Sequence, residues 1–239
     1  GADGKHLHAA PMARPNSPIG HADPEVTKVA NAALRPIGAC HPSDFLQFMD
    51  DTISHSPRVH RQAHAIVCTT DLIKKSPAVM YLHIFRLVGL ILKVLDPHMH
   101  SLRDYCLPAS TAALRTVVSQ YDNVVFQQTK QRLAAGDHVG QVIIYNMRTA
   151  TKWTMWTAHN KGVSAMQFSP NGDYLATYCN AQASLKVWQY EGVSVLGMPA
   201  SPKMMQNFTV QNNLLRTDPQ MFGTPGSALT WSANATEIR

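Results

Sequence analysis

The histidines are the residues whose chemistry has to be judged first. The chain has 12 of them in 239 residues, and imidazole is a common ligand of zinc. His60 and His64 are four positions apart, so they would share one face of a helix. The segment between them lacks the glutamate that serves as the base in a zinc protease. We therefore expect satisfied or exposed histidines rather than a metal site.

Paired carboxylates do not point to acid–base chemistry either. Asp44, Asp50 and Asp51 fill the polar side of a predicted amphipathic helix, and catalysis would require a cleft around them. The sequence has no glycine-rich phosphate loop, no dinucleotide fingerprint and no nucleophile elbow. The four cysteines are widely separated, as is typical of reduced thiols in a cytosolic protein. We predict a protein that is not an enzyme and uses no metal or cofactor.

The net charge of +6 divides evenly between the two halves of the chain, which does not favour nucleic-acid binding. Arg148, Lys152 and Lys161 would attract acidic surfaces weakly, although a solvated face explains the same charges. Residues 1–22 contain three prolines and little apolar periodicity, so we interpret them as a tail or loop remnant. The glycine at position 1 suggests a piece of a longer protein.

Residues 23–121 predict an α-helical segment. Helix starts are indicated by cap residues beside prolines, at Asp23-Pro24, Pro42-Ser43, Ser56-Pro57, Ser76-Pro77 and Asp96-Pro97. Three of these starts are 20 residues apart, which is typical of helical hairpins stacked as an α-solenoid resembling HEAT repeats. A last helix is expected over Pro108–Tyr121.

The run Ala78–Leu95 is apolar nearly all round, which predicts a central helix packed on two sides. A membrane span is the rival interpretation. Arg86 and Lys93, together with His83, would make that span costly, so we favour the buried helix.

Residues 122–239 predict antiparallel strands. Val163–Ser169 alternates as a strand with one buried face, Ser169–Gly172 is a turn, and Tyr174–Cys179 and Leu185–Gln189 are further strands. Arg132–Asn146 repeats this layout, with Tyr145 43 positions before Trp188. An interval of about 40 to 45 residues is typical of WD-repeat blades in a β-propeller. The fold class is therefore α+β multidomain, with a solenoid followed by two to three blades.

The blade signature is present in altered form. Tyr145-Asn146 and Trp188-Gln189 stand where the pattern has Trp-Asp, and His159 stands where it has the histidine of Gly-His. Val139 and Gln182 replace the aspartate of the turn, so His159 should make a substitute hydrogen bond in an incomplete buried network. Trp153, Trp156, Arg148, Lys152 and Lys161 are the candidate partner contacts, whereas Trp188 fits core packing better.

After Tyr190 the pattern weakens. Val193–Met198 would close the second blade, Pro199–Gln206 would be a linker, and Phe208–Val210 and Ser227–Ser232 would be strands of a third blade. Two or three blades cannot close a ring. We expect the missing blades to come from upstream in a longer chain or from a partner.

Several segments together resemble one family: Ile91–Pro97, Cys106–Pro108, Val124–Phe126, Leu133–Gly136, Tyr145–Trp153, Ser169–Tyr178 and Leu229–Ser232. Residues 40–239 are similar to the C-terminal region of the rabconnectin-3 beta subunit family, also called the WD-repeat protein 7 family, most specifically over Leu133–Trp188.

The resemblance implies a cytosolic scaffold that supports assembly and regulation of the vacuolar proton-pumping ATPase, and hence organelle acidification. It implies the rabconnectin-3 alpha subunit and subunits of the proton pump as partners, and endosomal or vesicular membranes reached only through them. The alternative is a helical and WD-repeat component of a vesicle coat or tether, or a substrate receptor of a ubiquitin ligase.

Overall fold

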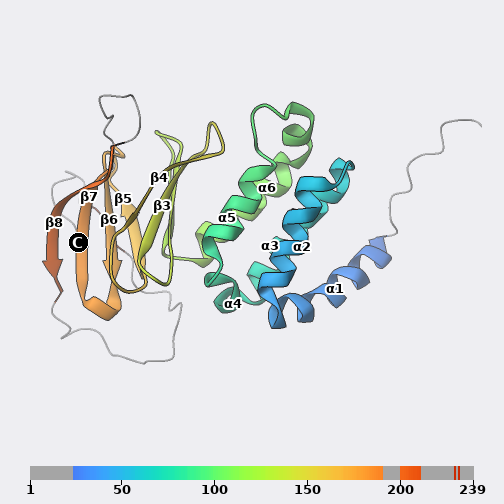
Figure 1. The fold of residues 1–239 in the computed structure, drawn as a ribbon, viewed down its shortest axis with the longest axis horizontal. Coiled ribbons are helices and arrows are strands. Elements are labelled where there is room, and N and C mark those ends of the chain that lie inside the picture. The colour runs from blue at the N-terminus through green and yellow to red at the C-terminus, as the bar shows by residue number, and fades with distance from the viewer. Residues whose placement is uncertain (1–23, 191–199, 211–228, 230, 232–239) are drawn as a thin grey trace, which may run out of the picture.

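The computed structural model describes residues 24–190, 200–210, 229 and 231. Six α-helices precede two antiparallel four-stranded sheets (Figure 1), which confirms the α+β layout. The helices are α1 (Pro24–Cys40), α2 (Pro42–His55), α3 (Val59–Lys75), α4 (Pro77–Tyr81), α5 (Ile84–Lys93) and α6 (His100–Gln120). Sheet 1 contains β1 (Val124–Gln127), β2 (Arg132–Gly136), β3 (Gln141–Asn146) and β4 (Thr151–Thr157). Sheet 2 contains β5 (Ala165–Phe168), β6 (Tyr174–Cys179), β7 (Ser184–Gln189) and β8 (Lys203–Thr209), with the 3₁₀ turn η1 (Asn180–Gln182) before β7.

The predicted helix starts at Pro24, Pro42 and Pro77 are confirmed, since a proline in the first turn loses no intrahelical hydrogen bond. The start at Ser56-Pro57 is wrong by two residues. Ser56 Oγ accepts a hydrogen bond from Arg58 N–H at 3.3 Å, and α3 begins only at Val59.

The apolar run Ala78–Leu95 is not one helix, as predicted, but two. Leu82 and His83 form a turn between α4 and α5. The His83 N–H donates to the Met80 carbonyl, three residues back, and not to the carbonyl four residues back as in an α-helix. The core position of the run is confirmed by Leu87, Val88 and Ile91, which are fully buried. None of the helices in the described part of the chain is long and apolar enough to cross a membrane.

The last helix begins earlier than predicted. Asp96-Pro97 starts a turn, in which Asp96 Oδ1 accepts the His98 N–H at 2.9 Å, and α6 begins at His100. Pro108 therefore lies inside α6 rather than at its start. Its ring is exposed, so water can satisfy the carbonyl that loses its hydrogen-bond donor.

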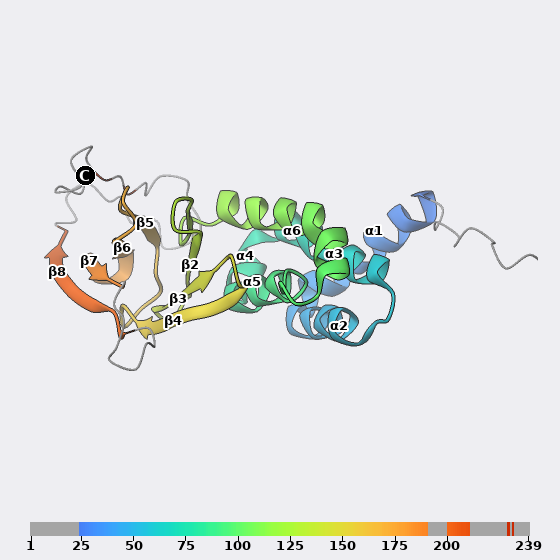
Figure 2. The same ribbon diagram turned by 90° about the horizontal axis from the view of Figure 1, so that it is seen from above.

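The helices pack in two layers, with α3 against α6 and α2 against α5 (Figure 2). Two cations of α5 bind the exposed side of α2: Arg86 donates to Gln47 Oε1 at 2.9 Å, and Lys93 lies 2.5 Å from Asp50. These pairs are exposed, so each contributes at most about 1 kcal/mol. A repeating superhelix is not shown by the helices of residues 24–120.

Each sheet is a simple meander, with strands paired in chain order. Phe208 lies in β8, the outer strand of sheet 2, so the assignment of Phe208–Val210 to a third blade is wrong. β8 also includes the second half of the predicted linker Pro199–Gln206, because residues 203–206 pair with β7. The single buried face predicted for Val163–Ser169 is wrong as well, since Ala165 and Met166 are both buried on opposite faces of β5.

Two predicted segments fall mainly outside the described residues. Val193–Met198 lies outside them entirely. Of Ser227–Ser232, the structure describes Leu229 and Trp231, and the Trp231 indole N–H donates to the Gln167 carbonyl of β5 at 3.2 Å.

The two sheets repeat each other closely. The pairing of β3 with β4 shifts register between Ile144 and Tyr145, and the pairing of β7 with β8 shifts between Val187 and Trp188, 43 residues later. Such bulges are specific local features of a strand pair rather than random defects. The same bulge at the same place shows that one structural unit occurs twice.

Sheet 1 is buried on both faces. Leu133, Ala135 and Tyr145 pack into the core formed with the helices, whereas Ala134 and Ile144, on the opposite face, pack into the core formed with sheet 2. Figures 1 and 2 both show this order, with the helices, sheet 1 and sheet 2 side by side.

The helices therefore occupy the face of sheet 1 on which a preceding sheet would stack. This face of sheet 1 is already filled by apolar side chains of α5 and α6. The expectation that missing blades come from upstream in a longer chain or from a partner stays a prediction. Polar contacts fix the arrangement: Tyr81 in α4 donates its hydroxyl hydrogen to the Val163 carbonyl before β5, at 3.1 Å.

Candidate interaction surface

A groove lies where the helices meet sheet 1. One wall is the C-terminal part of α5 and the loop after it, with Gly89, Leu92, Asp96 and Pro97, and the other is Tyr145 and the β3–β4 turn through Trp153. We call it the hairpin groove. Its volume is about 810 Å³, within the range of about 300–1,000 Å³ found for ligand-binding pockets. In Figure 1 the turn between β3 and β4 lies beside the helices at this point.

The groove is open along α5 because of a glycine. A Cβ built on Gly89 would have no heavy atom within 4 Å, so a side chain here would extend into free space. Tyr145 stands opposite, with 4% of its surface exposed, and burial raises the pKa of its hydroxyl. The groove thus has an apolar base with room above it.

Trp153 lines the groove at its β4 end, and its side chain packs against the core between the two sheets. It lies at the bulge of β4, half-buried, with the Arg132 guanidinium 4.2 Å from its ring centroid. Such a contact is a favourable cation–π arrangement. The indole Nε1 of Trp153 and Nε of Arg132 are both buried, and within the described part of the chain neither finds an acceptor. Buried donors without partners are uncommon in folded proteins.

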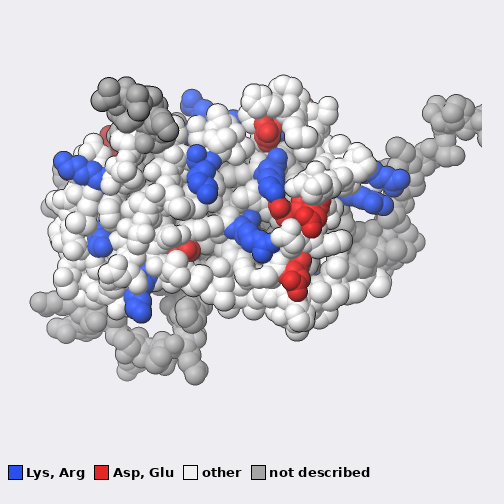
Figure 3. Space-filling model, viewed as in Figure 1, with Lys and Arg blue, Asp and Glu red and all other residues white. Residues whose placement is uncertain are grey.

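Three charged side chains line the hairpin groove: Lys93, Asp96 and Lys152. Lys152 lines it and is exposed, and Arg148 is exposed in the turn at its edge. Lys93 is paired with Asp50, whereas Asp96 accepts the backbone N–H of His98, a hydrogen bond that leaves its negative charge in place. On the face shown in Figure 3, acidic side chains gather over the helices, whereas the sheets carry mainly Lys and Arg. At the groove itself, the sheet side carries Lys152 and the helix side carries Asp96.

The turn at the groove's edge is strained. Ala150, which also lines the groove, has φ +55°, in the left-handed region that favours glycine. Residues held in this region cost about 1–3 kcal/mol and cluster at functional sites. The turn is held by Asn146 Oδ1, which accepts the Arg148 N–H, and by a hydrogen bond between the Thr149 and Thr151 hydroxyls.

The signature residues of sheet 2 form a buried network. His159 Nε2 lies 2.9 Å from Thr177 Oγ1, and Trp188 Nε1 donates to the same oxygen at 3.0 Å. Gln182 Oε1 instead accepts the Asn160 N–H, and within the described residues His159 Nδ1 has no hydrogen-bond partner in good geometry. In sheet 1 the turn aspartate is Asp137, whose Oδ1 accepts from Val139 N–H and Gln141 N–H. Tyr145 and Asn146 lie at the end of β3, and Gln189 lies at the end of β7. Tyr145 and Trp188 occupy corresponding positions beside the bulges of the two sheets.

Burial of His159 makes stability depend on pH. Burial, and then the charge of Lys186, lower the pKa of His159 from 6.5 to about 4, while the Thr177 backbone and the nearby Gln182 side chain oppose this. As pH falls below 6.5 the unfolded chain binds the proton first, so the contribution of His159 is full above pH 6.5 and is lost toward pH 4. We expect the free energy of unfolding of the wild type, measured by urea titration, to fall by roughly 2–3 kcal/mol between pH 6.5 and pH 4. His159→Gln should not show this fall. The same substitution at exposed His60 is the matched control, and an identical pH slope in His159→Gln and wild type would rule out this role.

The other predicted contact residues lie elsewhere. Trp156 is half-buried between the sheets, with its ring 5.7 Å from that of Trp188, and Lys161 is exposed in the loop beside the β2–β3 turn. The structure thus brings Lys152, Trp153 and Arg148 together at the hairpin groove, without Trp156 and Lys161. Sequence reasoning missed Arg132, Gly89 and Asp137. Only Asp137 carried a local signal, because it lies three residues before the turn glycine Gly140.

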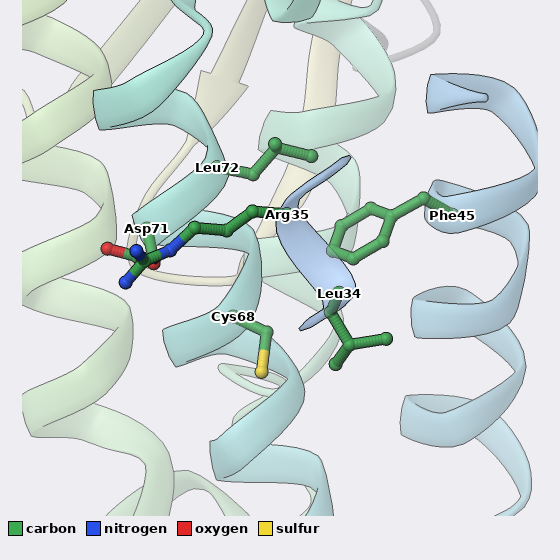
Figure 4. A pocket seen from close by; sticks show the side chains of 6 residues that line it. All are labelled: Leu34, Arg35, Phe45, Cys68, Asp71 and Leu72. Carbon is green, nitrogen blue, oxygen red and sulfur yellow. The ribbon is translucent and has the colours of Figure 1, made fainter. Parts of the chain in front are cut away.

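A second cavity lies inside the helical part (Figure 4) and has a different character. Its volume is about 10 Å³, close to the space of a single water molecule, and it lies under an ion pair of 2.6 Å between Arg35 of α1 and Asp71 of α3. Burial, and then the charge of Asp71, raise the pKa of the Cys68 thiol to about 11. The thiol is therefore protonated at neutral pH, and this cavity is a feature of helix packing.

The described residues contain no group of three His, Cys, Asp or Glu side chains close enough to hold a metal ion. His60 and His64 lie one turn apart on α3, and His60 is exposed.

No protein-family model matches the chain. Among solved structures, the chain is similar to the β-propeller domain of Cps50 (Swd1) from Myceliophteria thermophila, at 15% identity and a TM-score of 0.32. The match covers 48% of this chain and 32% of that one. A TM-score this low carries no inference of its own, so the interpretation as blades depends on the strand pairing and stacking described above.

Proposed function

We propose that the protein is a non-catalytic interaction scaffold, in which the helices are a segment of an α-solenoid and the two sheets are blades of an incomplete WD-repeat propeller. The observation that carries this proposal is the repeated four-stranded unit, with the same bulge 43 residues apart and the two sheets stacked. Repeated units stacked side by side expose extended surfaces, on which a few aromatic and cationic anchors supply most of the binding energy.

The partners we propose follow from the family resemblance. They are a subunit like rabconnectin-3 alpha and subunits of the vacuolar proton-pumping ATPase, with assembly and regulation of the pump, and thus vesicle acidification, as the outcome. The protein would work in the cytosol at endosomal or vesicular membranes, reached through these partners. Tyr145, Asn146, His159, Trp188 and Gln189 would serve as structural signature residues rather than as contacts.

Depletion of the protein from cells tests this proposal. We expect the pH of acidic vesicles to rise, and purification of the endogenous protein to recover pump and rabconnectin subunits in the same fraction. Unchanged vesicle pH together with recovery of coat subunits or cullin adaptors would instead support the coat, tether or ubiquitin-ligase alternative.

A further inference from the structure

We propose that Asn171 is a site of chemical modification. Its side-chain amide is converted to a carboxylate by attack of the Gly172 backbone nitrogen, at a rate set by opening of a contact between the two sheets. The inference goes beyond the scaffold function, because it concerns a covalent change in the chain itself. It starts from the turn at residues 169–173, which joins β5 to β6.

Asn171 is the only asparagine of the chain that precedes a glycine. Glycine has no Cβ, so its backbone nitrogen can approach the side-chain carbonyl carbon of the residue before it. After losing its proton, the Gly172 nitrogen forms a bond to Asn171 Cγ, the bond from Cγ to Nδ2 breaks, and ammonia leaves with that proton. Water then opens the cyclic imide at either carbonyl, which gives aspartate or isoaspartate. Water is the only co-reactant, and Asn171 is exposed to it.

The folded turn holds both reacting groups in hydrogen bonds. Asn171 Oδ1 accepts from the Ser169 hydroxyl at 2.7 Å and from Asp173 N–H at 3.2 Å, and Asn171 Nδ2 donates to Asp173 Oδ2 at 2.7 Å. The Gly172 N–H donates to the Ser169 carbonyl at 2.8 Å. The side chain is therefore fixed and the attacking nitrogen is engaged, so the reaction requires the turn to open locally.

Opening of this turn also breaks a contact between the sheets. Asp173 forms an ion pair of 2.5 Å with Lys130, which lies in the turn between β1 and β2 of sheet 1. Beside it, Gln127 Nε2 donates to the Pro170 carbonyl at 3.0 Å. The rate of modification at Asn171 should therefore depend on side chains of the other sheet.

The product weakens the same contact. Loss of Nδ2 removes the hydrogen bond to Asp173 Oδ2 and leaves two carboxylates side by side, which repel each other. Isoaspartate also lengthens the backbone of a turn in which Gly172 has φ +73° and its carbonyl accepts the Tyr190 hydroxyl. Because neither product returns to asparagine in water, the change is permanent, and the two sheets are held together less firmly after it.

Incubation of the purified chain at mildly alkaline pH, followed by mass spectrometry of its peptides, tests the proposal. We expect conversion at Asn171 before any other asparagine. Conversion should be roughly tenfold faster in concentrated urea, where the turn is open. Methylation of the product by an isoaspartyl methyltransferase measures the isoaspartate independently.

Lys130→Gln tests the link to sheet 1. It removes the ion pair to Asp173 and leaves residues 169–173 unchanged, so Asn171 of the folded variant should convert roughly threefold faster than in wild type. Lys130→Arg keeps the charge and should restore the wild-type rate. Lys74→Gln is the matched control, since it makes the same change at an exposed lysine of α3. In urea all four chains should react at one rate, because the sequence around Asn171 is the same.

The proposal is overturned if other asparagines convert before Asn171, or if Asn171 converts as fast in the folded chain as in urea. It is also overturned if folded Lys130→Gln, checked by circular dichroism, reacts at the wild-type rate, or if Lys74→Gln accelerates the reaction equally. The scaffold proposal has separate readouts, vesicle pH and recovered partners, which these rates leave untouched.

Discussion

Replacing Gly140 with alanine is expected to lower the free energy of unfolding by about 2–5 kcal/mol. Gly140 has φ +98°, and a Cβ there would overlap the backbone carbonyl oxygen of His159. The positive φ costs about 1–2 kcal/mol for an alanine, and forcing the backbone apart adds about 1–3 kcal/mol. The Gly140 carbonyl also accepts the N–H groups of Ala158 and His159, so a shift of the backbone would weaken the attachment of the β2–β3 turn to the segment that leads from β4 to sheet 2. Urea unfolding followed by circular dichroism measures the effect.

Gly89→Ala is the control for this substitution. The site lies inside α5 with free space around the added methyl group, so we expect a gain of up to about 1 kcal/mol. If both alanine variants were equally stable, the close approach of the β2–β3 turn to residues 158–161 would be wrong.

Replacing Tyr145 with alanine is expected to cost about 3–5 kcal/mol, the usual loss for truncating a buried aromatic side chain. Tyr145 projects from β3 into the core that sheet 1 shares with the helices. Its loss should therefore loosen the helices and sheet 1 together, and not only the strand that carries it. Tyr145→Phe keeps the ring and should lose no more than about 1.5 kcal/mol.

Thermal unfolding of these two variants, followed separately by a helix signal and by tryptophan fluorescence, distinguishes the possibilities. We expect the two signals to coincide in Tyr145→Ala at a lowered midpoint. A variant as stable as wild type would mean that the helix-facing side of sheet 1 is not packed as described.

Local patterns in the sequence predicted the features that depend on neighbouring residues. Proline beside a cap residue identified three helix starts, at Pro24, Pro42 and Pro77. The interval of 43 residues between Tyr145 and Trp188 corresponds to the repeated bulge. The helix starts were predictable because capping and turn chemistry act over a few residues.

Features set by contacts between distant segments were not predictable in this way. The break at Leu82 and His83 lies within an unbroken apolar run, and Pro108 stays in α6 because its ring faces solvent. β8 was mistaken for part of a third blade, since nothing in its own sequence shows that it pairs with β7 across an intervening segment.

The hairpin groove illustrates the same limit. Trp153 and Lys152 stood out as residue types common at interfaces. That they line one groove with Gly89 follows only from the packing of α5 against sheet 1, because Lys152 lies 63 residues after Gly89 in the chain.

The placement of the helices limits where further sheets could stack on sheets 1 and 2. Because α5 and α6 cover one face of sheet 1 and sheet 2 covers the other, a further sheet in the same stack would have to lie beyond sheet 2. The helical and strand parts of the chain share one core, and the hairpin groove lies at their junction.

Native-state hydrogen exchange, compared between wild type and Tyr145→Ala, tests most directly whether sheet 1 is enclosed between the helices and sheet 2. We predict that the amides of α5, α6, β2 and β3 exchange in one cooperative unit and lose protection together in the variant. Loss of protection in β2 and β3 with unchanged protection in α5 and α6 would contradict the shared core.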